Sequence, residues 1–171
     1  MYHCQVGRKK QYWTRGYVFT IGLLDGTVGL GQVLGWEPEA LNSAGCAFFD
    51  YRFSETESIS LETLDLSIDR AISAILVSRD SLDRHYWRVI GNCPVRLRQR
   101  DVPYEAYRTY QWVGSTTHGS GTVTEFLRAF HGLRFWDDWH DPHHLDTLLL
   151  SIDRRPRTGL IFKRQPASDA G

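Results

Sequence analysis

The stretch GYVFTIGLLDGTVGLGQVLGW, residues 16–36, places Asp25-Gly26 between two runs of β-branched and aromatic residues. A two-residue type I′ turn needs positive φ, and glycine adopts it without steric cost. Asp-Gly between two such runs is therefore a strong hairpin signal. The sequence predicts strands at about 16–23 and 28–35, joined by this turn.

Three closely spaced glycines in the second run, Gly29, Gly31 and Gly35, superficially resemble a glycine-rich phosphate loop. Such a loop lies between a strand and the N-terminus of a helix. Here the hydrophobic pattern of the strand continues through Val33 and Leu34. These glycines therefore indicate bulges or close backbone approach within a bent sheet rather than a nucleotide site.

Further strand patterns follow along the chain, separated by polar turns. Apolar, β-branched and aromatic runs of strand length predict strands at about 45–53, 71–77 and 86–91. One last short strand is predicted at 158–162. Together with the hairpin, these runs predict a sheet of about six strands.

Helical signals begin after Trp112. Thr122 and Glu125 match a capping box, and Gly132 is placed to end that helix. Asp141-Pro142 reads as the N-cap and first residue of a second helix, which should end before Pro156. The predicted fold is α+β: a bent antiparallel β-sheet or partial barrel of about six strands, with two C-terminal helices packed on it.

A length of 171 residues with 42% hydrophobic content suits one packed domain. We predict a single domain over 1–164, with a β-rich part at 16–114 and a helical part at 115–164, and a disordered tail at 165–171.

No apolar run has the length of a signal peptide or a membrane span, so we expect a cytoplasmic protein without membrane contact. Three widely spaced cysteines indicate neither a disulfide framework nor a thiolate metal site.

The charges cancel in sum but not along the chain. Twenty Lys and Arg oppose twenty Asp and Glu, which disfavours a non-specific polyanion binder. Residues 37–69 hold eight acidic side chains and one basic side chain, whereas 84–108 is rich in arginine. The acidic stretch is either a solvated connection or a face for a basic partner. Arginines and tyrosines in 84–108 would also suit single-strand nucleic acid, although they equally fit an ordinary sheet.

The segment WDDWHDPHHLD, residues 136–146, is the densest polar cluster. Imidazoles and carboxylates are zinc and iron ligands, so a small metal-dependent hydrolase is an alternative function. The spacing of these histidines does not suit a metal site, because adjacent side chains diverge by about 100° on a helix. We therefore predict no cofactor, and the alternative ligand set is His140, His143, His144 and Asp146.

Trp136 and Trp139 flank Asp137 and Asp138 between the predicted helices. Large aromatic side chains beside carboxylates are typical of recognition surfaces. The alternative is that both indoles fill the gap between the helices and the sheet.

Several motifs occur in an order that resembles the immunity protein 26 family of bacterial polymorphic-toxin systems. These are a glycine-led G-x-V-F strand, an Asp-Gly hairpin followed by G-x-G-x-V-L, and a later W-x-V-I-G followed by proline. The C-terminal FLRAFHGLRFWDDWHDPHHLD is similar to an extension found in relatives. The matching positions are Gly16, Val18, Phe19, Asp25, Gly26, Gly29, Gly31, Val33, Leu34, Trp87, Val89, Ile90, Gly91 and Pro94.

This resemblance implies a non-enzymatic cytoplasmic protein that neutralises a cognate toxin by tight, non-covalent binding, and it supplies no catalytic residues. If the toxin is a nuclease, carboxylates would complement its basic substrate groove, with an aromatic anchor. The predicted partner-binding residues are Trp136, Asp137, Asp138, Trp139, Glu55, Glu57, Glu62 and Asp65.

Overall fold

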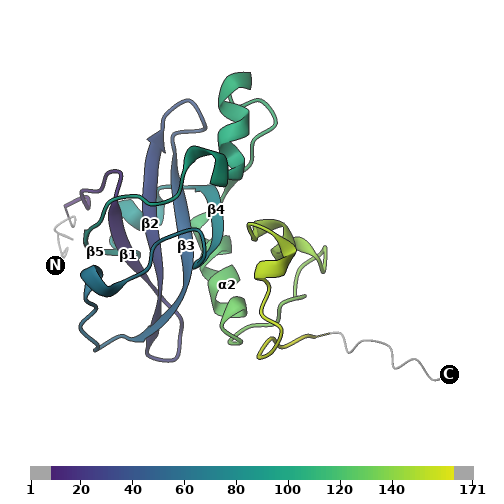
Figure 1. The fold of residues 1–171 in the computed structure, drawn as a ribbon. Coiled ribbons are helices and arrows are strands. Elements are labelled where there is room, and N and C mark those ends of the chain that lie inside the picture. Colours follow the sequence, from purple (N-terminus) through teal and green to yellow (C-terminus); the bar gives the residue numbers. More distant parts are fainter. Residues whose placement is uncertain (1–8, 164–171) are drawn as a thin grey trace, which may run out of the picture.

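A computed structural model describes residues 9–163 of the chain. Its centre is one six-stranded sheet with the order β5-β1-β2-β3-β4-β6 (Figure 1). The strands are β1 (Tyr17–Gly22), β2 (Thr27–Glu37), β3 (Ser43–Ser54), β4 (Ala71–Val77), β5 (Arg88–Asn92) and β6 (Thr117–His118). The predicted α+β class and the number of strands are confirmed, but β6 was not predicted and takes the place of the expected strand at 158–162. The sheet is open, and all its pairs are antiparallel except β4 with β6.

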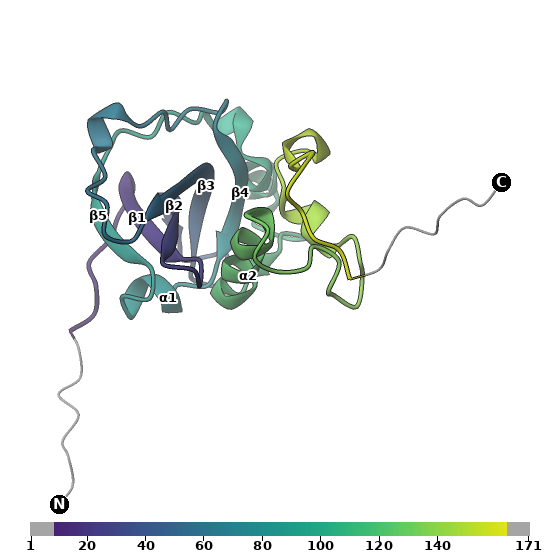
Figure 2. The same cartoon turned by 90° about the horizontal axis from the view of Figure 1, so that it is seen from below.

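The sheet is apolar on both faces. Along β3, Cys46 and Phe48 face one buried cluster, whereas Ala47 and Phe49 face another. This follows from the period of two along a strand. Helix α2 (Ser120–Phe130) covers the first face, and the irregular connections after β3 and β5 cover the second (Figure 2).

Short helical turns complete the chain. Helix α1 (Asp80–Asp83) links β4 to β5, where the sequence predicted only a polar turn. The 3₁₀ turns are η1 (Leu61–Thr63), η2 (Gln99–Asp101), η3 (Pro103–Tyr110), η4 (His144–Leu148) and η5 (Ile152–Arg154). None of the helices within residues 9–163 is long and apolar enough to cross a membrane.

The β1–β2 hairpin is confirmed, but its turn is longer than predicted. The Leu23 amide donates to the Thr27 carbonyl, which leaves Leu24, Asp25 and Gly26 in the loop. Gly26 has the expected positive φ of 77°, and Leu24 also has a positive φ, 82°.

Helix α2 begins two residues earlier than the predicted capping box. The Ser78 hydroxyl, at the end of β4, accepts a hydrogen bond of 2.9 Å from the Ser120 amide. Because a residue directly after β4 satisfies this N-terminal amide, the helix begins at Ser120 and Thr122 lies inside it. Gly132 follows the helix with a φ of 76°, as the sequence predicted.

The predicted helix from Asp141-Pro142 does not form. The segment contains only η4 and η5, and its backbone bonds to the sheet instead. The Leu150 amide donates to the Ile72 carbonyl at 2.8 Å, and the Ser73 hydroxyl donates to the Leu148 carbonyl. A continuous α-helix would use these backbone groups internally. The predicted strand at 158–162 is likewise reduced to one bridge between Phe135 and Ile161.

The predicted disordered tail, 165–171, lies outside the described residues. Cys46 is buried in the core and Cys93 is half-buried, and both are free thiols.

Gly31 tests the aromatic packing of the first face. A β-carbon at Gly31 would lie 2.5 Å from the Phe19 ring, whereas one at Gly22 would meet nothing within 4 Å. We expect Gly31→Ala to lower the free energy of unfolding by about 1–3 kcal/mol, because the ring must move within a packed core. Urea denaturation measures this, with Gly22→Ala as the matched control. Equal stability of the two variants would show that Phe19 is loosely packed.

Candidate partner-binding surface

Trp136 lies in the core and not on the surface. Its side chain is 1% exposed and packs against Phe126, with ring centroids 5.9 Å apart. Its indole Nε1 donates a 2.9 Å hydrogen bond to Asp146. Of the two interpretations, the structure gives Trp136 the role of filling the gap beside α2.

The other residues of this loop divide between interior and surface. Asp137 is buried and accepts a 2.6 Å hydrogen bond from the Lys163 amide. Asp138 is exposed and pairs with the Lys163 ammonium at 2.8 Å. Trp139 is half-buried against the His144 ring, with centroids 4.8 Å apart. Only Asp138 and Trp139 thus offer surface to a partner here.

The histidines and Asp146 do not converge on one point. His143 Nδ1 lies 3.3 Å from Asp146, but His140 is exposed and His144 faces Trp139. Within residues 9–163, no group of three or more His, Cys, Asp or Glu side chains could hold a metal ion. The metal-hydrolase alternative therefore finds no preformed ligand set in this part of the chain.

Asp146 acts as a structural acceptor. Partial burial raises the pKa of its carboxyl, but hydrogen bonds from Trp136, His143 and Arg155 outweigh this and hold the pKa below its usual value. A lowered pKa means that the ionised carboxylate stabilises the fold, and that this stabilisation fades as pH falls through the lowered value.

The acidic residues of 55–65 fall on different parts of the surface. Glu55, Glu57 and Glu62 are exposed, and the Glu57 carboxylate accepts a hydrogen bond from the Ser54 amide. Asp65 is half-buried and lies 3.5 Å from Arg96. Hydrogen bonds from Ser67 lower the pKa of Asp65, with Arg96 adding to the effect. Asp65 is therefore already partnered within the fold.

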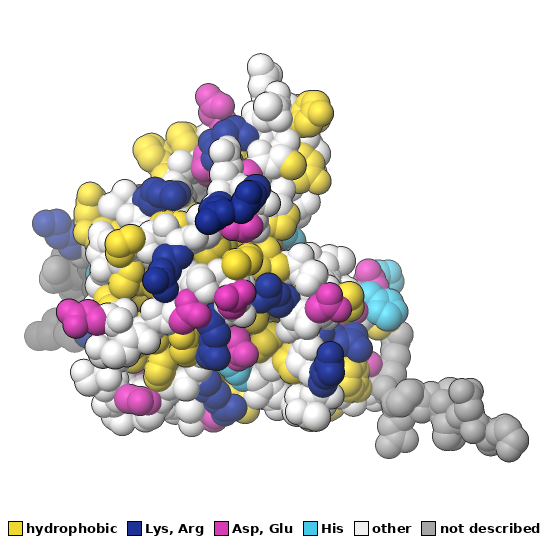
Figure 3. All heavy atoms as spheres, in the orientation of Figure 1, with side chains coloured by type: hydrophobic (Ala, Val, Ile, Leu, Met, Phe, Trp, Pro, Cys, Tyr) yellow, Lys and Arg dark blue, Asp and Glu magenta, His cyan; other side chains and the backbone are white. Residues whose placement is uncertain are grey.

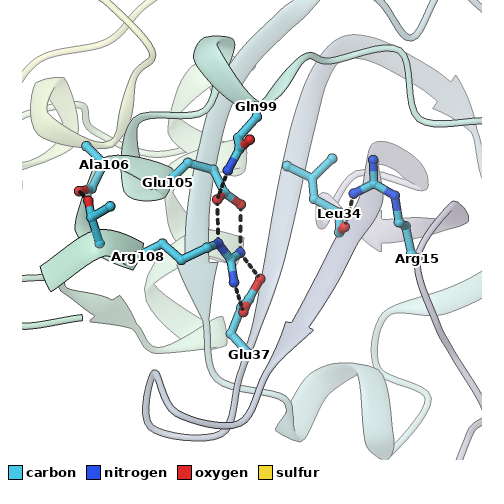
Figure 4. Close-up of polar contacts among 8 residues, drawn as sticks. Arg15, Leu34, Glu37, Gln99, Glu105, Ala106 and Arg108 are labelled. Atoms are coloured by element: carbon cyan, nitrogen blue, oxygen red, sulfur yellow. Dashed lines mark hydrogen bonds and ion pairs between the residues drawn. The ribbon is translucent and has the colours of Figure 1, made fainter. Parts of the chain in front are cut away.

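Two arginines of segment 84–108, Arg96 and Arg108, pair with carboxylates of the acidic stretch. Arg108, on η3, binds Glu37 at 2.6 and 3.0 Å and Glu105 at 2.7 and 2.9 Å (Figure 4). These carboxylates raise the pKa of the Arg108 guanidinium. The space-filling view shows basic and acidic side chains interspersed over this face (Figure 3).

The aromatic residues of that segment divide between the core and the surface. Trp87 and Tyr104 are buried on opposite faces of the sheet, whereas Tyr86 is 70% exposed and Tyr107 is 39% exposed. Bases cannot stack on rings that lie inside the core. Of the aromatic rings in this segment, Tyr86 and Tyr107 remain open to solvent.

Glu55 and Glu57 share one groove, which we call the β5 groove. It has a volume of about 570 Å³ and runs between the loop after β3 and the start of β5. Its main lining side chains are Glu55, Glu57, His85, Tyr86, Arg88 and Ile90. Two carboxylates beside an exposed tyrosine and isoleucine give the groove both charge and apolar contact area, as protein recognition requires.

Sequence reasoning considered Tyr86 only for base stacking and missed it as part of a protein-binding groove, because its place depends on the preceding residue. His85 has a positive φ of 65°, and its Nε2 lies 2.9 Å from the Lys9 carbonyl. This turn directs Trp87 into the core while Tyr86 faces solvent. No local sequence pattern signals a left-handed histidine.

Within residues 9–163, the structure has an exposed groove beside β5 and no preformed metal centre. The family model for Immunity protein 26 matches residues 14–111, more than half of the chain. The chain therefore belongs to the Immunity protein 26 family, as its motifs indicated. No curated protein and no solved structure matches the chain. The match includes Glu55, Glu57 and Tyr86 and ends before the Trp136–Trp139 loop.

The contrast between the two tryptophans of that loop can be measured. We expect Trp136→Phe to lower the free energy of unfolding by about 1–3 kcal/mol, because it removes a buried hydrogen bond and part of a packed ring. Trp139→Phe, at a half-exposed position, is the control and should change stability by less than about 0.5 kcal/mol. Similar losses in both variants would contradict the assignment of Trp136 to the core.

Metal dependence has a separate test. A bound metal would stabilise the folded state by mass action, and its removal would lower the melting temperature. Because we expect no bound metal, we expect EDTA to leave the melting temperature of untagged protein unchanged. Stoichiometric zinc or iron by elemental analysis, with a fall in melting temperature on chelation, would restore the hydrolase alternative.

Proposed function

We propose that this protein is a cytoplasmic immunity protein that neutralises a cognate polymorphic toxin by non-covalent binding. The observation that carries the proposal is membership of the Immunity protein 26 family over residues 14–111. On this proposal, inhibition is stoichiometric and needs neither catalysis nor a cofactor.

We further propose that the β5 groove contacts the toxin. The groove lies within the matched part of the chain and combines Glu55 and Glu57 with exposed Tyr86. Carboxylates at such a position would attract a basic surface, such as the substrate groove of a nuclease, and accelerate association. Trp136 and Asp137 are buried, so they would act by supporting the fold. Toxin contacts by Glu62, Asp65, Asp138 and Trp139 stay predictions.

The decisive experiment uses the product of the neighbouring gene, which on this proposal carries the cognate toxin domain. We expect the purified protein to bind that domain with a one-to-one end point and to abolish its activity at equivalence. Absence of binding and of inhibition would overturn the proposed function.

Charge reversal tests the groove. We expect Glu55→Lys combined with Glu57→Lys to weaken toxin binding about tenfold or more, mainly through slower association at low salt, because steering depends on these charges. Asp153→Lys, an exposed reversal on η5, is the matched control. Unchanged association rates in the double variant, with its melting temperature preserved, would remove the groove from the interface.

A further inference from the structure

A second surface lies where three separate segments of the chain meet. Neither the sequence motifs nor the family match assigns a role to it. Arg79, between β4 and α1, stands over the rings of Trp13 and Trp36, with its guanidinium carbon 5.7 Å from each ring centroid. Both distances are within the range of cation–π interactions. We call Tyr12, Trp13, Trp36, Arg79 and Asp83 the Trp13–Trp36 cluster.

Hydrogen bonds hold the polar edges of this cluster in place. The Trp13 indole donates to Asp83 at 2.8 Å, and the Trp36 indole donates to Asn42 at 2.7 Å. Arg79 donates to Asn42 at 2.8 Å and to Asp83 at 3.2 Å. Because both indoles and the guanidinium are fixed, a partner would bind them with little loss of side-chain entropy.

Gln11 anchors the N-terminal segment that carries Tyr12 and Trp13. Its buried side chain donates to the carbonyls of Leu82 and Trp87 at 2.7 and 2.8 Å. It also accepts a 3.1 Å hydrogen bond from the Val89 amide. The segment is therefore attached firmly to the start of β5.

The cluster nevertheless leaves a large apolar area in water. Tyr12 is 73% exposed, Trp36 is 54% exposed, and nearby Leu41 is 83% exposed. Trp36 is the one exposed tryptophan of the six in the chain, and it lines a hollow of about 550 Å³ with Tyr12 and Trp13. Tryptophan, tyrosine and arginine are the residues that most often dominate binding energy at protein interfaces.

The charges around the hollow indicate the chemistry of its occupant. Three cations, Lys9, Lys10 and Arg79, line it against one carboxylate, Asp83. That carboxylate is already bound by Trp13, Lys10 and Arg79. Burial raises its pKa, but these hydrogen bonds outweigh the burial and lower the pKa overall. The remaining positive charge favours an acidic occupant.

The cluster is continuous with the β5 groove. Lys9 lines the hollow, and its carbonyl lies 2.9 Å from Nε2 of His85, which lines the groove. A partner that covers both sites would meet an excess of carboxylates in the groove, where Glu55 and Glu57 outnumber Arg88. At the hollow it would meet an excess of cations, where three basic side chains outnumber Asp83. A standard protein interface buries roughly 800 Å² per partner, which is large enough to span two adjacent sites of this size.

We propose that the Trp13–Trp36 cluster is the aromatic anchor site of the toxin interface, and that it receives an acidic segment of the toxin bearing an apolar side chain. This inference rests on the proposed function. An open, largely apolar hollow beside clustered cations suits a side chain flanked by carboxylates. A nucleic acid would need a continuous basic track along its backbone.

Binding of the cognate toxin domain to full-length variants tests this assignment. We expect Trp36→Ala to weaken binding about tenfold or more, mostly through faster dissociation. Lys10→Glu should slow association and reduce its dependence on salt. Tyr110→Ala is the matched control, because this ring is 70% exposed but lies on η3, which packs on the opposite face of the sheet. Circular dichroism melting confirms that each variant folds.

The outcomes separate this inference from the proposed function. If the wild type inhibits the toxin and both Trp36→Ala and Lys10→Glu bind as tightly as the wild type, the cluster is not the anchor and the function stands. If the wild type fails to bind the toxin, both proposals fall.

Two other possible occupants of the cluster, a second copy of the chain and a nucleic acid, can be tested directly. Concentration-dependent dimerisation that Trp36→Ala abolishes would assign the cluster to a second copy of the chain and overturn the proposal. Salt-sensitive binding of a single-stranded oligonucleotide that the same substitution abolishes would overturn it in favour of nucleic acid.

Discussion

Both faces of the central sheet are buried, yet within residues 9–163 the chain supplies a long α-helix for only one of them. The other face is covered by irregular backbone, and irregular backbone leaves N–H and C=O groups without regular partners. Side chains take that role. Arg154 donates to the carbonyls of Ile68, Asp69 and Ala71, and the buried Gln32 donates to those of Gly16 and Cys93. The positions of the loops, and of both proposed contact sites, depend on such bonds.

This dependence explains which parts of the fold could be predicted from the sequence. The hairpin and β4 follow from local turn chemistry and strand periodicity, and their bounds agree with the structure within two residues. The predicted helix after Pro142 failed because Leu148 and Leu150 bond to β4, a strand more than seventy residues earlier. The start of α2 moved for the same kind of reason, since Ser78 caps it from β4.

The candidate site shows the same division. Glu55 and Glu57 were recognisable because acidic residues gather in one stretch of sequence. Trp136 matched a recognition loop equally well, but its partners Phe126 and Asp146 place it in the core. Trp13, Trp36 and Arg79 carry no local motif, and only the folded sheet brings them together. The acidic and basic stretches are separate in the sequence, but the fold brings them into contact at Arg108, which binds Glu37.

The central claim is that one face, from the β5 groove to the Trp13–Trp36 cluster, binds the cognate toxin. Hydrogen–deuterium exchange of the protein alone and in complex with the toxin domain tests it directly. We predict slower exchange on binding in two segments, 9–14 and 85–90, with little change across 135–150. Protection confined to 135–150, with 9–14 and 85–90 unchanged, would contradict it.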